Sequence, residues 1–175
     1  MRKTHFVLSF CFLLVATGSA LAQRVDVDWD HSADFSMYRT YAWMESKNPA
    51  PDIWDQRIVQ DIDLQLTAKG LQKAETGQQP DLFVVYNADV KQQTSLEGYD
   101  YDFGPGWRWG GGGPVELRPV TENVGTLTVD LVDAQKKHLI WRGTATEVLS
   151  DKSEKNIHKV EKATSKMFEK YPPRE

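Results

Sequence analysis

The chain has 175 residues, a formal net charge of −4 and one cysteine. An acidic chain without a basic patch argues against nucleic acid as a partner. One cysteine excludes a disulfide framework and a cysteine-based metal site within the chain.

Residues 1–22 have the three parts of a secretory signal peptide. A positively charged start precedes the apolar core at residues 6–16, and residues 20–22 (ALA) give the small-x-small cleavage pattern. The apolar run is shorter than the roughly 20 residues that a membrane span needs. We therefore expect a periplasmic protein that begins at Gln23 and has no transmembrane span.

The position of Cys11 does not fit a lipid anchor. The modified cysteine of a bacterial lipoprotein follows the apolar core and has small residues before it. Here the bulky Phe10 precedes Cys11, and little of the apolar run comes first. Cleavage after Ala22 would remove Cys11, so we do not expect anchoring to the outer membrane.

Residues 25–30 (VDVDWD) alternate between apolar and acidic, which predicts a strand with Val25, Val27 and Trp29 facing inward. The outward aspartates have two interpretations. Calcium prefers clustered carboxylates, but an EF-hand loop needs glycine where His31 stands. An edge strand that is protected by charge explains the pattern equally well. We assign no metal ligands.

A second strand is predicted at residues 38–44, followed by a helix at residues 53–69. Asp52 is the expected N-cap of this helix, and Gly70 is placed to end it. Apolar residues recur at helical spacing and predict a stripe that faces the core. This stripe consists of Trp54, Ile58, Val59, Ile62 and Leu66.

Residues 73–79 form a polar loop in this interpretation. Residues 81–86 (DLFVVY) are apolar on both faces, which predicts a strand in the centre of the sheet. Residues 88–94 continue that strand while becoming polar.

The segment Gly98–Pro114 contains seven of the 12 glycines, two prolines and five aromatic residues. Glycine makes ordering costly, so we expect a loop that is longer than ordinary connections. Either its exposed aromatic residues bind a ligand or partner, or the segment is a low-complexity insertion whose aromatic residues fold back on the sheet. The candidate binding residues are Tyr99, Tyr101, Trp107, Arg108 and Trp109.

Residues 124–149 predict a hairpin that is coherent in one register, with Asp130 opposite Arg142. One face then pairs Thr126 with Thr146, Thr128 with Thr144 and Val132 with Ile140. The other face pairs Leu127 with Ala145, Val129 with Gly143 and Leu131 with Trp141. We expect Trp141 to lie beneath helices, Gly143 to permit their close approach, and Arg142 to face water. The polar face is either a solvated sheet surface or a ligand-binding surface.

A second helix follows, and Asp151 with Glu154 forms a capping-box pattern at its start. Pro172 and Pro173 stop the helix. Its apolar stripe consists of Ile157, Val160, Ala163, Met167 and Tyr171.

No catalytic signature stands out. The histidines after the signal peptide (His31, His138 and His158) lack zinc-site spacing, and no Gly-x-Ser-x-Gly elbow is present. Carboxylates are plentiful, but nothing in the sequence selects an acid/base pair. We therefore assign no catalytic residue and no cofactor, and whether the protein is an enzyme stays open.

Several motifs in order resemble a bacterial envelope family known as domain-of-unknown-function family 4136. These motifs are Asp30 with the segment from Asp34 to Trp43, Leu66-x-x-Lys69-Gly70-Leu71, Pro80-Asp81-Leu82, Leu127-x-Val129-Asp130-Leu131, Trp141-Arg142-Gly143 and Tyr171-Pro172-Pro173. The resemblance implies a secreted or lipid-anchored envelope protein without an established activity. It supplies no catalytic residues.

Together these patterns predict one α+β domain over residues 23–175. We expect a two-layer sandwich in which a mostly antiparallel sheet of four or five strands carries two helices on one face, in the order β-β-α-β-β-β-α. The leading functional hypothesis is a non-enzymatic binding or assembly module with an envelope protein or glycan as partner. The alternatives are a carbohydrate-binding protein that uses Trp107 and Trp109, and a carboxylate-based hydrolase.

Overall fold

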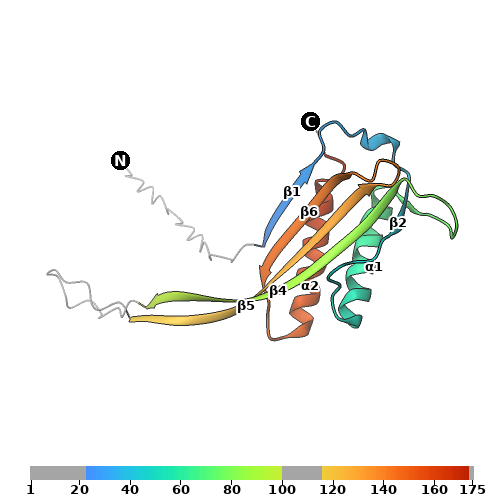
Figure 1. The fold of residues 1–175 in the computed structure, drawn as a ribbon. Helices are drawn as coiled ribbons and strands as arrows, with labels where there is room; N and C mark the ends of the chain where they lie inside the picture. Colours follow the sequence, from blue (N-terminus) through green and yellow to red (C-terminus); the bar gives the residue numbers. More distant parts are fainter. Residues whose placement is uncertain (1–22, 100–115, 174–175) are drawn as a thin grey trace, which may run out of the picture.

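A computed structural model describes residues 23–99 and 116–173. Two helices cover one face of a six-stranded sheet, so the protein is an α+β two-layer sandwich (Figure 1). The strand order in the sheet is β1-β6-β5-β4-β2-β3. The elements are β1 (Arg24–Trp29), the short 3-10 helix η1 (Phe35–Met37), β2 (Thr40–Trp43), α1 (Asp52–Ala68), β3 (Gln72–Lys73), β4 (Leu82–Tyr99), β5 (Glu116–Asp133), β6 (Leu139–Val148) and α2 (Ser153–Glu169).

The sheet is mixed, so the prediction of a mostly antiparallel sheet with four or five strands is correct only in part. β2 runs parallel to both β3 and β4. The reason is α1, which carries the chain back along the sheet so that the next strand starts from the same end as β2. The sixth strand, β3, was not predicted, and its two residues lie at and just before the start of the predicted polar loop of residues 73–79.

The predicted hairpin register is confirmed at six of its seven pairs, including Asp130 with Arg142 and Leu131 with Trp141. The pair of Val132 with Ile140 is wrong. A bulge between Leu131 and Val132 places Val132 opposite Leu139. A bulge adds one residue to one strand, which turns the side chains beyond it. Ile140 is consequently buried, and Leu139 is exposed.

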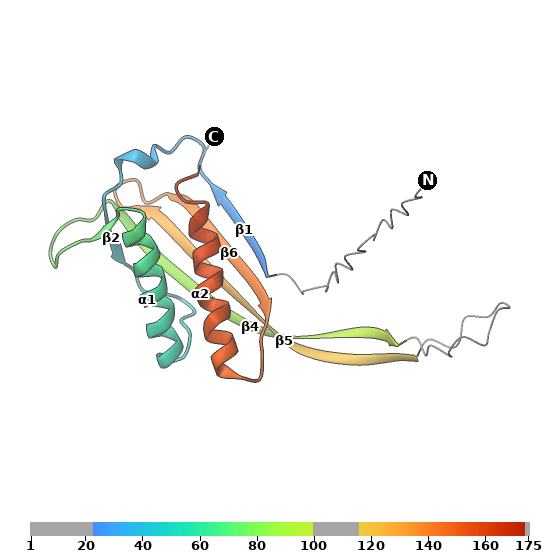
Figure 2. The same cartoon turned by 180° about the vertical axis from the view of Figure 1, so that it is seen from behind.

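Trp141 lies on the face of the sheet that the helices cover in Figure 2, since it contacts Phe168 of α2, and none of its side chain is exposed. It packs in an aromatic cluster with Phe168 and Tyr171, at ring-centroid distances of 5.1 and 5.7 Å. Arg142 faces the opposite side, where its Nε and Nη2 donate to the two carboxylate oxygens of Asp130, each at 2.7 Å. The polar face of the hairpin is therefore the outer face of the sheet.

Both helix starts differ from the prediction. Pro51 is the N-cap of α1, and Asp52 is the first helical residue. Lys152 is the N-cap of α2 and makes no side-chain cap, so the box formed by Asp151 and Glu154 is absent. Instead, the Asn156 amide accepts from the Ser150 backbone N–H and donates to its carbonyl, both at 2.7 Å.

Three smaller predictions are confirmed. β1 is an edge strand that pairs only with β6. β4 and β5 are the central strands. Gly70 follows α1 with a φ of +86°, a conformation that favours glycine.

Candidate functional site

The strands β4 and β5 continue well past the rest of the sheet (Figure 1). β2 pairs with β4 only between Leu82 and Val84, and β6 pairs with β5 only between Val124 and Val132. In the described structure, residues 92–99 and 116–123 form strand pairs only with each other, and at the base the Leu149 backbone N–H donates to the Asn123 carbonyl at 2.7 Å. We call this two-stranded extension the β-ribbon.

The face of the sheet that packs against the helices continues along the ribbon, where it is exposed to solvent. Residues two apart share a face, so the row of β4 that includes Tyr86 and Ala88 under the helices continues through Val90 to Leu96 in the ribbon. Beyond the helices this row has nothing above it in the described structure (Figure 2). Leu96 is accordingly 65% exposed.

The facing strand adds apolar surface to the same face. Pro119 lies directly opposite Leu96, and Leu117 lies opposite Gly98. Leu117 is 58% exposed. Polar pairs separate these residues from the domain, such as Thr94 and Thr121, whose hydroxyls lie 3.1 Å apart. The outer half of the ribbon therefore presents a small apolar patch, and polar residue pairs separate this patch from the domain.

An isolated two-stranded hairpin is only marginally stable in water, because it buries little and leaves the backbone groups of both edges unpaired. Pro119 has no N–H to offer, so strand addition is favoured along β4 rather than along β5. A surface with an open edge and an uncovered apolar face is suited to binding another protein.

The ribbon also fixes where the predicted aromatic segment starts and ends. Gly98 and Tyr99 belong to β4, so the loop begins later than predicted. Tyr99 pairs with Glu116, so the two residues that flank segment 100–115 lie opposite each other at the end of the described ribbon. Four of the predicted binding residues lie outside the described residues, namely Tyr101, Trp107, Arg108 and Trp109.

The carboxylates at the opposite end of the domain already have partners. Asp133 is 5% exposed and accepts from the backbone N–H groups of Gln135 and Lys136, both at 2.8 Å, and from the Tyr38 hydroxyl at 3.0 Å. Asp81 accepts from the backbone N–H groups of Arg39 and Thr40, both at 2.9 Å.

Asp30 and Asp34 cap local turns in the same way, through Ser32 and Ser36. They line a polar cleft of about 630 Å³ together with Tyr38 and several neighbours. Four motif residues of the family resemblance (Asp30, Asp34, Tyr38 and Asp81) thus lie at this end of the fold, and their hydrogen bonds explain why those residue types stand there. We therefore assign them a structural role.

Acid should destabilise the fold through Asp133. Hydrogen bonds from Lys136, Tyr38 and Gln135 hold the pKa of its carboxyl below the usual value near 4. A lowered folded-state pKa contributes stability above the unfolded-state pKa, and this contribution is lost as the pH falls through the folded-state pKa. In Asp133→Asn the free energy of unfolding should therefore fall less between pH 6 and pH 3, measured by urea titration. Asp151→Asn, at an exposed site, is the matched control, and an equal slope in both variants would contradict the assignment.

The three predicted histidines have separate local partners. His138 Nε2 lies 3.5 Å from Asp30 Oδ2, His158 Nδ1 lies 3.0 Å from Glu161 Oε2, and the His31 ring lies 5.0 Å from the Trp29 ring. Within residues 23–99 and 116–173, no group of three metal-ligating side chains comes together. In the same residues, no helix is long and apolar enough to cross a bilayer.

Comparisons with known proteins agree with this architecture. The sequence model of a domain of unknown function, DUF4136, matches residues 25–173. A search of curated protein sequences gives no match. A crystal structure of a DUF4136 family protein from Bacteroides thetaiotaomicron is similar in fold, with a TM-score of 0.55, 17% identity, and coverage of 86% of this chain and 96% of that chain.

Two further solved structures share the fold at low identity. A PDZ domain protein from Parabacteroides distasonis has a TM-score of 0.57 and 17% identity over 87% of this chain, which spans 37% of that longer protein. PelC from Paraburkholderia phytofirmans, described as a dodecamer, has a TM-score of 0.51 and 13% identity, with coverage of 88% of this chain and all of that chain.

Proposed function

The chain belongs to the DUF4136 family, and we propose that it is a non-enzymatic module of the bacterial cell envelope that assembles with another protein through its β-ribbon. The single observation that carries this proposal is the ribbon itself. It extends the sheet beyond both helices, with an open β4 edge and exposed apolar side chains at Leu96 and Leu117.

The energetics support a protein partner. A partner strand along β4 would satisfy unpaired backbone groups, and a partner surface on the apolar patch would remove Leu96, Leu117 and Pro119 from water. Because the ribbon has no other support in the described structure, its order and its binding are coupled. Among proteins of the same fold, PelC is described as a dodecamer, so association between copies of this chain is the first interaction to test.

Envelope location is part of this proposal. The signal-peptide pattern of residues 1–22 and the family resemblance support it. Tyr99, Tyr101, Trp107, Arg108 and Trp109 remain proposed contact residues, since the two residues that flank segment 100–115 lie at the end of the described ribbon.

The ribbon can be removed without cutting the domain. Lys91 and Val124 face each other at its base, so replacing residues 92–123 by Asn-Gly would close β4 and β5 with a two-residue turn. The shortened protein should keep its thermal midpoint and lose its partner. In the full-length protein the partner is detected with a photo-crosslinking residue at Ser95 in intact cells. In the shortened protein, which lacks Ser95, loss of the partner is measured by the solution mass of the purified protein.

Point variants provide a matched comparison. Leu96→Asp with Leu117→Asp should abolish the Ser95 crosslink, whereas Leu64→Asp with Ile53→Asp should leave it unchanged. Leu64 and Ile53 of α1 are as exposed as the two ribbon leucines, at 66% and 70%. Equal loss in both pairs, or no protein crosslink in the wild type, would refute assembly through the ribbon. Binding to peptidoglycan fragments in place of protein would favour the carbohydrate alternative.

A further inference from the structure

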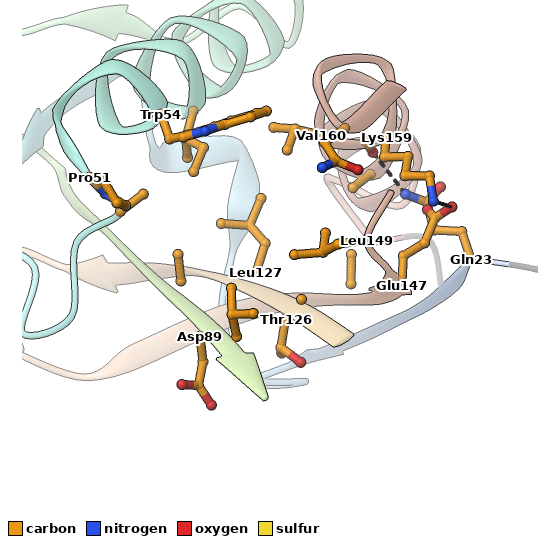
Figure 3. A pocket seen from close by; sticks show the side chains of 18 of the residues that line it. Gln23, Pro51, Trp54, Asp89, Thr126, Leu127, Glu147, Leu149, Lys159 and Val160 are labelled. Carbon is orange, nitrogen blue, oxygen red and sulfur yellow. Dashed lines mark hydrogen bonds and ion pairs between the residues drawn. The ribbon is translucent and has the colours of Figure 1, made fainter. Parts of the chain in front are cut away.

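A second feature of the domain has no part in the ribbon proposal. Between α1, α2 and the sheet lies an apolar groove with a volume of about 350 Å³ (Figure 3). This volume falls within the roughly 300–1,000 Å³ that is typical of small-molecule sites. Trp54 and Ile58 of α1 and Val160 of α2 form its sides, and Leu127 and Leu149 lie below them.

The groove exists because the helix-facing side chains of three neighbouring strands are smaller at this end of the sheet. On the helix-facing rows, Tyr86 is followed by Ala88 in β4, and Leu127 by Gly125 in β5. In β6 the large Trp141 is followed on the same row by Gly143, whose space Trp141 and Met167 fill, and then by Ala145 at the groove. Small side chains cannot fill the space between a sheet and its helices, so a gap opens between the layers.

One end of the groove is polar. Lys159 of α2 and Glu147 of β6 form an ion pair with an Nζ to Oε1 distance of 3.3 Å, and both side chains are about three-quarters covered. Gln23 completes this end and donates from Nε2 to the Lys159 carbonyl at 2.9 Å. The three labelled residues lie together in Figure 3.

This polar end is not fully satisfied. Glu147 Oε2 and Gln23 Oε1 are both shielded from solvent and have no hydrogen-bond donor. A shielded acceptor without a donor costs free energy, so such atoms are normally paired. A modest rotation of either side chain toward the groove would allow a bound donor to reach it.

We propose that the groove binds a single-chain amphiphile, with its hydrocarbon chain between Trp54, Leu127 and Val160 and a zwitterionic head group at the Glu147–Lys159 pair. The lining is almost entirely apolar along its length, which suits a hydrocarbon chain. A head group with one ammonium and one phosphate complements the pair, because its ammonium faces Glu147 and its phosphate faces Lys159. Lysophosphatidylethanolamine has this chemistry.

Trp54 allows the proposal to be tested directly. Bromine atoms quench tryptophan fluorescence on contact, so a lysophosphatidylethanolamine with a brominated chain should quench the purified protein in a saturable manner below its micelle concentration. Trp54→Phe should remove most of the quenching while calorimetry still detects binding. Brominated dodecanoate tests a free fatty acid as the source of the chain, and it should bind at least about tenfold more weakly because it lacks the ammonium.

Blocking variants distinguish the groove from the rest of the surface. Ala88→Phe fills its floor, and Ala50→Phe fills its rim as a second variant if the first fails to fold. Both should lower affinity at least about tenfold, whereas Ala42→Phe, on the outer face of β2, should not. Glu147→Gln should weaken the zwitterionic lipid more than dodecanoate.

Two results would overturn the proposal. Equal, non-saturable quenching in wild type and Ala88→Phe would show that the lipid adsorbs without a site. A solution mass that falls from oligomer to monomer in Ala88→Phe, without lipid binding in the wild type, would assign the groove to a second copy of the chain. Loss of the ribbon leaves lipid binding unchanged under this proposal, so the two proposals fail independently.

Discussion

Replacing Trp141 with alanine is expected to lower the free energy of unfolding by roughly 3–5 kcal/mol, the usual range for a fully buried large aromatic residue. The Trp141 side chain has no exposed surface and lies between the sheet and α2. Its removal takes away the contacts with Phe168 and Tyr171 and leaves a cavity that rigid neighbouring strands cannot close. Urea unfolding, followed by circular dichroism, measures the loss.

Trp141→Phe is the matched control for this prediction. Phenylalanine keeps a ring in the aromatic cluster and removes the indole N–H, which is buried without a hydrogen-bond partner. The loss in Trp141→Phe should therefore be much smaller than in the alanine variant. If both variants are within about 0.5 kcal/mol of the wild type, as surface substitutions usually are, Trp141 does not hold the two layers together.

Gly143→Ala is the second large effect, and it acts by crowding rather than by a cavity. A methyl group at residue 143 would lie 2.6 Å from Trp141 Cη2 and 2.9 Å from Met167 Sδ. Both neighbours are completely buried, so neither can move aside freely. Overpacking of this kind costs roughly 1–3 kcal/mol.

Gly125→Ala provides a comparison in the neighbouring strand. A methyl group there would meet only side-chain carbons of Leu149, the nearest at 2.9 Å. Leu149 is partly exposed and borders the groove, so it has space to rotate. Its substitution should cost clearly less than Gly143→Ala in the same urea assay. A larger loss of unfolding free energy in Gly125→Ala would show that α2 does not pack tightly against β6 at Gly143.

The alternation of residues along β5 and β6 was sufficient to predict their pairing. Asp130 opposite Arg142 and Leu131 opposite Trp141 follow from one rule, because a shift by one residue would exchange the faces of every side chain. Alternation also predicted β1 as a strand, and of the two interpretations of its aspartates, the edge strand agrees with the observed strand order. The bulge between Leu131 and Val132 was not predicted, since the alternation of residues on both sides of it fits an unbroken register.

The candidate site was located only in part. Glycines and aromatic residues at 98–114 directed attention to this end of the sheet, but the β-ribbon that flanks the segment was not predicted. On one face of β4, the apolar residues Val90 and Leu96 flank the polar residues Gln92 and Thr94, and this pattern does not differ from that of an ordinary half-buried strand. Nothing local distinguishes a strand that a helix covers from one that extends past the helices.

The sequence by itself determined which residues share a strand face and that Trp141 faces the core. It also determined that one helix ends before Gly70 and the other before Pro172. These features depend on neighbours within a few residues. Only the tertiary structure decided that β2 runs parallel to β4 and that β4 and β5 extend beyond the helices. It also decided that Ala88, Gly125 and Ala145 lie beside one another beneath a groove. These features arise where segments far apart in the chain meet. Their geometry is set by the lengths of several elements together rather than by the pattern within any one of them.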